Sequence, residues 1–143
     1  MPADFIDSNI FVYLFDSTDT RRRDIARETV QRGIADGSAI ISFQVVQEVL
    51  NVTTHKMERP LSDTDAIAFF DTVLAPLWRV YPSADLYRRA IEVKTRYRFG
   101  LYDSLIVASA LEAGCTRLLS EDLQDGGLRT GQVIGRLTVK SPF

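Results

Sequence analysis

The stretch GLYDSLIVASAL, residues 100–111, is apolar almost throughout but contains one aspartate, Asp103. Ile106, Val107 and Ala110 follow it at steps of three, four and seven residues, which is the spacing of one face of an α-helix. The predicted helix therefore carries a carboxylate on its apolar face. Removing an ionised carboxylate from water is costly, so an acid at this position needs a cation or several hydrogen bonds.

Short apolar runs alternate with longer helical patterns along the rest of the chain. Strands are predicted at residues 3–7, 38–42, 78–81, 115–120 and 132–139. Helices are predicted at residues 9–15, 17–37, 43–57, 62–77 and 83–97, in addition to the helix that begins near residue 100 and is closed by Gly114. Such alternation predicts a mainly parallel sheet with helices on both faces, in a single domain that spans residues 1–143.

The composition is that of an ordinary globular protein, with 45% of the 143 residues apolar and 25% charged. A net charge of −2 gives no electrostatic reason to bind nucleic acid and argues against a purely charge-driven binder. One cysteine, Cys115, excludes an internal disulfide and a multi-cysteine zinc site. We find neither a signal peptide nor the run of roughly 18 apolar residues that a membrane span needs, so we expect a cytoplasmic protein without membrane association.

Four acids fall at suggestive positions: two follow strand ends, where a parallel sheet collects ligands, and two touch the apolar faces of helices. Asp7 ends the first predicted strand, and Asp122 follows the strand at 115–120. Glu48 lies at the edge of the apolar face of the helix at 43–57. Each acid, including Asp103, also has an ordinary explanation as a helix cap, a turn residue or a solvent-facing side chain. One shared cause is nevertheless more economical than four coincidences.

A cluster of carboxylates is the ligand set that hard divalent cations prefer. Mg²⁺ and Mn²⁺ take oxygen ligands, keep several waters and bridge protein carboxylates to substrate phosphates. Two such ions about 4 Å apart can activate a water and stabilise the leaving oxygen when a phosphodiester is cleaved. A cation would offset the cost of burying the charge of Asp103.

Four segments of the chain carry a family resemblance. They are FIDSNIFVYLFD (residues 5–16), SFQVVQEVLNV (42–52), YDSLIVASALEAGCTRLLSEDLQDG (102–126) and LTVKSPF (137–143). Together they resemble the PIN-domain family, and specifically the VapC-type toxins of toxin–antitoxin pairs. The resemblance implies a three-layer α/β/α sandwich and a ribonuclease that depends on Mg²⁺ or Mn²⁺. It also implies an RNA substrate, a cognate antitoxin protein as partner, and a possible homodimer.

The resemblance assigns roles to individual residues. The acids of the metal site are expected to be Asp7, Glu48, Asp103 and Asp122. Asn9 matches the polar residue that orients the first acid, and Ser120 matches the hydroxyl residue that precedes the last one. The fourth acid has two rivals nearby, Glu121 and Asp125, and the stretch GLRTGQ at residues 127–132 resembles a small insertion relative to the family.

Some other residues are candidates for contact with RNA. The end of the predicted helix at 83–97 combines basic side chains with an aromatic ring, which suits phosphates and a stacked base, although a solvated helix face explains it equally well. These residues are Lys94, Arg96, Tyr97 and Arg98. The only histidine, His55, lies roughly 10 Å along its helix from Glu48 and is expected at the surface. One histidine also argues against cleavage by a metal-free pair of histidines.

Two other classes of protein compete with a metal-dependent ribonuclease. A phosphatase of the haloacid-dehalogenase type needs a second acid two residues after the first, and Asn9 occupies that position. A non-catalytic module that binds nucleic acid or protein is the second alternative. A receiver-like domain needs adjacent acids at the end of the first strand, and a degenerate relative would have lost acids that are present here. We therefore favour the ribonuclease and keep the binding module as the alternative.

Overall fold

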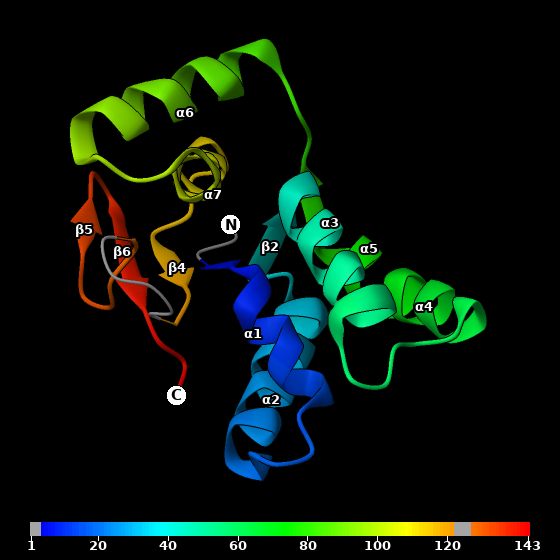
Figure 1. The fold of residues 1–143 in the computed structure, drawn as a ribbon. Coiled ribbons are helices and arrows are strands. Elements are labelled where there is room, and N and C mark those ends of the chain that lie inside the picture. Colours follow the sequence, from blue (N-terminus) through cyan, green and yellow to red (C-terminus); the bar gives the residue numbers. More distant parts are fainter. Residues whose placement is uncertain (1–3, 122–126) are drawn as a thin grey trace.

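The computed structural model describes residues 4–121 and 127–143. Within these residues, six strands form one sheet in the order β3-β2-β1-β4-β6-β5 (Figure 1). They are β1 (Asp4–Ile6), β2 (Ala39–Ser42), β3 (Trp78–Val80), β4 (Arg117–Leu119), β5 (Val133–Ile134) and β6 (Leu137–Lys140). All neighbouring strands are parallel except β5 and β6. The strand order reverses between β1 and β4, and the crevice at such a reversal is where open α/β sheets bind ligands.

The helices lie on both sides of this sheet. They are α1 (Ser8–Val12), α2 (Thr20–Asp36), α3 (Phe43–Asn51), α4 (Asp63–Phe69), α5 (Ala75–Leu77), α6 (Ala84–Tyr97) and α7 (Leu101–Glu112), with single turns η1 (Tyr13–Phe15), η2 (Val52–Lys56) and η3 (Phe70–Leu74). In Figure 1, α6 and α7 lie above the sheet, and α1 and α2 lie below it. The predicted mainly parallel α/β/α sandwich is confirmed.

Local sequence signals explain where the long helix α2 begins and ends. The side chain of Asp19 accepts a hydrogen bond from the backbone amide of Arg22 at 3.1 Å and so caps the first turn. Gly37 ends the helix in a left-handed conformation, with φ of 70°. Gly33 lets α2 approach the sheet, because a Cβ at that position would lie 2.6 Å from the Cβ of Ala39 at the start of β2.

Helix α7 is more deeply buried than its sequence pattern predicts. Every residue from 104 to 110 is buried, so the helix has no solvent-facing side along that stretch. A helix that is apolar all round belongs in the interior. The predicted apolar face is thus part of a helix enclosed by the sheet and α6. Asp103 is half-buried and lies in its first turn, where Leu101 and Tyr102 are exposed.

The predicted strand at 132–139 differs from the structure, and the predicted helices at 9–15, 43–57 and 62–77 change geometry along their length. Residues 132–139 form a hairpin rather than one strand, because Gly135 adopts a φ of 59° and reverses the chain between β5 and β6. The predicted helix at 62–77 is divided into α4, η3 and α5, and it ends at Leu77, one residue beyond Pro76. No helix in residues 4–121 or 127–143 has the length and apolar character to cross a membrane.

Candidate active site

Asp7 lies at the point where the strand order reverses. It follows β1, and its backbone amide donates a hydrogen bond to the carbonyl of Leu119 in β4 at 2.9 Å. Its carboxylate accepts a hydrogen bond from the backbone amide of Ser8 at 2.7 Å and caps α1. Asp7 is only 8% exposed. The residue is therefore both a helix cap and a buried acid.

A second set of hydrogen bonds joins Asp7 to the end of β4. The hydroxyl of Ser120 donates to Asp7 Oδ2 at 2.8 Å. Asn9 Nδ2 donates to Ser120 Oγ at 3.3 Å and to the carbonyl of Glu121 at 2.9 Å. The backbone amide of Glu121 donates back to Asn9 Oδ1 at 3.4 Å. Asn9 and Ser120, both expected beside the first acid, thus hold that acid against the neighbouring strand end.

Glu48 is held within the molecule, although the sequence also allowed a solvent-facing position. Ser8 Oγ donates to Glu48 Oε2 at 2.7 Å, and Gln44 Nε2 donates to Glu48 Oε1 at 2.6 Å. Gln44 Nε2 also donates to the carbonyl of Tyr102 at 3.1 Å. These contacts connect the acid on α3 to α1 and to the first turn of α7.

Asp103 lies in the first turn of α7 without capping it, because the N-cap residue is Gly100. Its carboxylate accepts a hydrogen bond from the backbone amide of Leu128. Together with Asp7 and Glu48 it lines one pocket of about 210 Å³. Of the residues that the structure places around this pocket, none is basic.

The electrostatics of this pocket disfavour ionised acids. Burial raises the pKa of Asp7 to about 6, against the lowering effect of its hydrogen bonds from Ser120 and Ser8, and the charges of Glu48 and Asp103 raise it further. Burial also raises the pKa of Asp103; the Leu128 amide lowers it, and the charge of Glu48 raises it. The pocket therefore has negative charge that its surroundings do not neutralise.

These acids fit a divalent cation by the chemistry of their donor atoms. Carboxylate oxygens from three elements face one pocket, and uncompensated negative charge favours a cation there. In the described part of the chain, no three acidic, histidine or cysteine side chains are grouped closely enough to enclose an ion. Mg²⁺ keeps several waters and needs few direct carboxylate ligands, so the arrangement remains compatible with it. Asp122 and its rival Asp125 lie outside the described residues.

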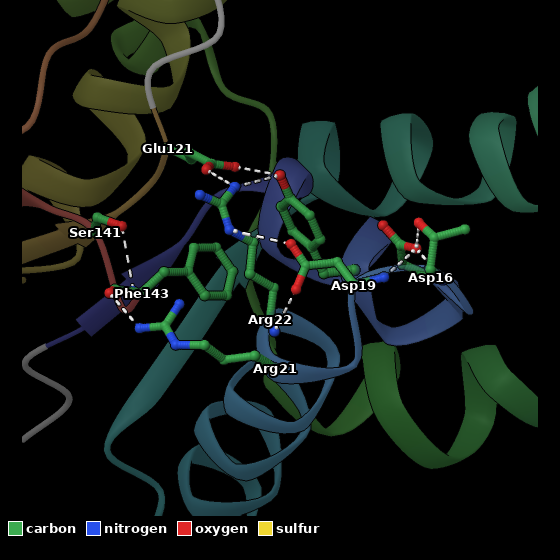
Figure 2. Close-up of polar contacts among 9 residues, drawn as sticks. Asp16, Asp19, Arg21, Arg22, Glu121, Ser141 and Phe143 are labelled. Carbon is green, nitrogen blue, oxygen red and sulfur yellow. Dashed lines mark hydrogen bonds and ion pairs between the residues drawn. The ribbon is translucent and has the colours of Figure 1, made fainter.

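Glu121, the other rival for the fourth acid, has a carboxylate that is already paired (Figure 2). Arg22 Nη1 forms an ion pair and a hydrogen bond with Glu121 Oε1. The hydroxyl of Tyr13 donates to Glu121 Oε2 at 2.5 Å. Glu121 borders the pocket, but the guanidinium of Arg22 already neutralises its charge, unlike the charges of Asp7, Glu48 and Asp103.

The remaining candidates do not line the pocket. His55 is exposed in η2, as expected. Lys94, Arg96 and Arg98 are exposed at the end of α6. The ring of Tyr97 is half-buried and stacks on Phe99, with ring centroids 5.9 Å apart and an interplanar angle of 11°. The proposed contact of this segment with RNA therefore lies outside the acid pocket.

Several pocket residues were not singled out from the sequence. Ser8 bridges Asp7 to Glu48, Gln44 holds Glu48, and Tyr102 contributes a carbonyl and an exposed ring beside Asp103. Gln44 precedes Glu48 by four residues, so helical spacing predicts their contact. Nothing in the sequence signals the Leu128 amide, which approaches Asp103 through tertiary structure alone.

Comparisons with solved structures find the same fold. VapC20 of Mycobacterium tuberculosis, a toxin that cleaves the sarcin–ricin loop, has 21% identity over 86% of this chain and 92% of that chain, with a TM-score of 0.60. VapBC2 from Rickettsia felis, bound to a DNA fragment from its promoter, has 17% identity over 96% and 97% of the chains and a TM-score of 0.68. A toxin–antitoxin complex from Klebsiella pneumoniae has 19% identity over 98% of each chain and a TM-score of 0.64.

Sequence comparison gives a consistent result. No curated protein matched the chain significantly. The family model of the PIN domain matches residues 5–124, which include the pocket acids Asp7, Glu48 and Asp103 and the strand β4. The family predicted from the sequence is confirmed: the chain belongs to the PIN-domain family.

Proposed function

We propose that the chain is a divalent-metal-dependent ribonuclease that hydrolyses phosphodiester bonds in RNA. The observation that carries this proposal is the pocket at the strand-order reversal. Asp7, Glu48 and Asp103 reach it from three different elements, and no basic side chain among the described lining residues neutralises them. Membership of the PIN-domain family supports the same activity.

The pocket residues have distinct roles in this proposal. Asp7, Glu48 and Asp103 would hold Mg²⁺ or Mn²⁺, with Asp122 as the fourth acid expected from the sequence. A bound ion of this kind lowers the pKa of water and stabilises negative charge on a phosphate.

The hydrogen bonds around Asp7 prepare its carboxylate for such an ion. The Ser120 hydroxyl donates to Oδ2, and the amide and hydroxyl of Ser8 donate to Oδ1, so the carboxylate is oriented and Oδ2 keeps a lone pair for an ion. Asn9 cannot act as the second acid of a haloacid-dehalogenase-type phosphatase, because it is an amide whose nitrogen and oxygen both bond to the end of β4.

We further propose that the chain is the toxin of a toxin–antitoxin pair in the cytoplasm, with a cognate antitoxin as partner. The support is the similarity of the fold to VapC20 and to two toxin–antitoxin complexes. A homodimer is compatible with this proposal. Exposed apolar side chains on α6 and α7, such as Ile91 at 58%, offer a surface for such an assembly.

The activity can be tested directly with the purified chain and total cellular RNA. Cleavage is expected with Mg²⁺ or Mn²⁺ and is expected to stop in EDTA; sequencing of the new ends identifies the sites. Asp7→Asn and Asp103→Asn should each abolish cleavage, because an amide keeps the shape and loses the anionic ligand. His55→Ala is the matched control and should cleave like the wild type, since His55 is exposed and outside the pocket. Equal cleavage in EDTA would remove the metal mechanism.

A further inference from the structure

Arg22 connects helix α2 to the segment that follows β4. Its guanidinium forms an ion pair with Glu121 and donates from Nη1 to the hydroxyl of Tyr13 at 3.0 Å. That hydroxyl in turn donates to the other oxygen of Glu121. Figure 2 shows the side chains of Arg22 and Glu121 meeting, although the two residues are 99 positions apart in the sequence.

The guanidinium of Arg22 is itself held on several sides. Its Nε lies 3.4 Å from Asp19 Oδ2, in an ion pair with the residue that caps α2. The guanidinium carbon lies 5.5 Å from the ring centre of Tyr13 and 5.3 Å from that of Phe143, and these two rings contact each other edge to face. A planar cation between two rings has little freedom to reorient.

This cluster is linked to the acid pocket through the backbone of Glu121. The carbonyl and amide of Glu121 both bond to the side chain of Asn9. Asn9 also donates to the Ser120 hydroxyl, and that hydroxyl donates to Asp7. A continuous series of contacts therefore runs from Arg22 to the most buried acid of the pocket.

The Arg22–Glu121 pair differs from an ordinary surface ion pair. The Glu121 side chain is only 16% exposed and that of Arg22 is 35% exposed. Arg32 and Glu28, four residues apart on the same helix, form a pair whose side chains are 63% and 74% exposed. Exposed pairs of that kind contribute little. The partly buried pair also keeps the Glu121 carboxylate away from the other acids, where its charge would repel theirs.

We propose that Arg22 is a positioning residue for the acid pocket: with Tyr13 it pins Glu121, and it thereby sets the positions of Asn9 and Ser120 that orient the Asp7 carboxylate. The part of this proposal that concerns cation binding rests on the metal-dependent function proposed above. Its structural part, the placement of Asp7 and Ser120, can be measured without any metal.

The test compares Arg22→Met, Glu121→Gln and the double variant with wild type, and Arg32→Met serves as the matched control on α2. Isothermal titration calorimetry measures the affinity for Mn²⁺. Hydrogen exchange followed by NMR measures the exchange rates of backbone amides in the metal-free protein. We expect Arg22→Met to weaken Mn²⁺ binding by about tenfold, the effect typical of residues that orient metal ligands. The double variant should bind Mn²⁺ no more weakly than the single variant with the lower affinity, because both changes remove the same interaction. Arg22→Lys should recover part of the affinity, and Arg32→Met should bind Mn²⁺ like wild type.

In the exchange experiment, the backbone amides of Asp7 and Ser120 report on the pocket. They donate to Leu119 and Lys140, at 2.9 Å in each case. Arg22→Met should speed their exchange relative to amides elsewhere in the sheet. If that variant does not fold, Tyr13→Phe removes only the hydroxyl contact with Glu121, and a smaller change in the same direction is expected.

The outcomes separate the two proposals. A wild type that neither binds Mn²⁺ nor cleaves RNA overturns the proposed function, and the exchange rates then decide the role of Arg22 alone. A wild type that binds Mn²⁺, with Arg22→Met equal in affinity and in amide exchange, overturns the positioning role. Tighter Mn²⁺ binding by Arg22→Met would also overturn it, because Glu121 would then be a ligand that Arg22 withholds.

Discussion

Asp7 combines two roles that sequence reasoning treats as alternatives, since it caps α1 and is also a buried acid. An asparagine at this position can still cap the helix but cannot ionise. The two roles can therefore be separated by the pH dependence of stability.

The pKa of Asp7 in the folded protein, about 6, lies above the ordinary value of 3.8 for an aspartate. The folded protein thus holds this proton more tightly than the unfolded chain, and the associated stability is complete below about pH 4 and lost as the pH rises through about 6. The loss is at most about 3 kcal/mol. Urea unfolding in EDTA at pH 4.5 and 7 should show a larger decline for the wild type than for Asp7→Asn, in which Asp103 still has a raised pKa. Identical pH dependence in both proteins would mean that Asp7 is not the group that titrates.

Asp103 should couple cation binding to stability. Millimolar Mn²⁺ is expected to raise the melting temperature of the wild type, by an amount equivalent to roughly 2.7 kcal/mol when the ion is at a hundred times its Kd. In metal-free buffer, Asp103→Asn should melt no lower than wild type, because it relieves repulsion from Glu48. Thermal melts with Mn²⁺ and with EDTA measure both effects. A variant that keeps the full Mn²⁺ shift would contradict the ligand role, and capping is no alternative explanation, since Gly100 occupies that position.

Helix α2 approaches the sheet closely where Gly33 meets Ala39. Gly33→Ala should destabilise the protein by about 1–2 kcal/mol, because overpacking costs more than the better helix propensity of alanine returns. Urea unfolding gives this difference, and Gln31→Ala on the exposed side of the helix is the control, expected within about 0.5 kcal/mol of wild type. Unchanged stability of Gly33→Ala would show that α2 can move away from β2 at little cost.

At the level of elements, the sequence predicts those whose signals are local. Capping side chains and apolar spacing identify the helices, and the parallel topology follows from their alternation with strands. The hairpin of β5 and β6 was missed because a lone glycine, Gly135, is a weak turn signal within an apolar run.

The candidate site likewise has parts that the sequence predicts and parts that only the folded chain creates. Asp7, Glu48 and Asp103 line one pocket. The position of Asp7 at the end of β1 follows from sequence order, because ligands collect beyond the strand ends of a parallel sheet, whereas Asp103 lies in the first turn of a helix that follows another helix. The pairing of Glu121 with Arg22 is not predictable in this way, since only the packed fold brings together residues 99 positions apart.

For the whole molecule, the proposed toxin role predicts an effect on growth. Expression of the chain alone should slow the growth of its host, and co-expression of the product of an adjacent gene should relieve the effect. Growth curves at matched soluble expression measure this, with Asp103→Asn as the inactive control. Normal growth with the wild-type chain would favour the alternative of a PIN-domain protein that binds without cutting.

The pairing of β1 with β4 also has a consequence for folding. The contact between Asp7 and Ser120 spans 113 residues, so forming it closes a loop of most of the chain. Contacts with such sequence separation cost loop-closure entropy and slow folding, whereas the turns of α2 or α6 form from neighbouring residues. A partly folded chain can therefore contain its helices and still lack the pocket. The pocket is therefore expected to form only when the two ends of the chain have come together in the sheet.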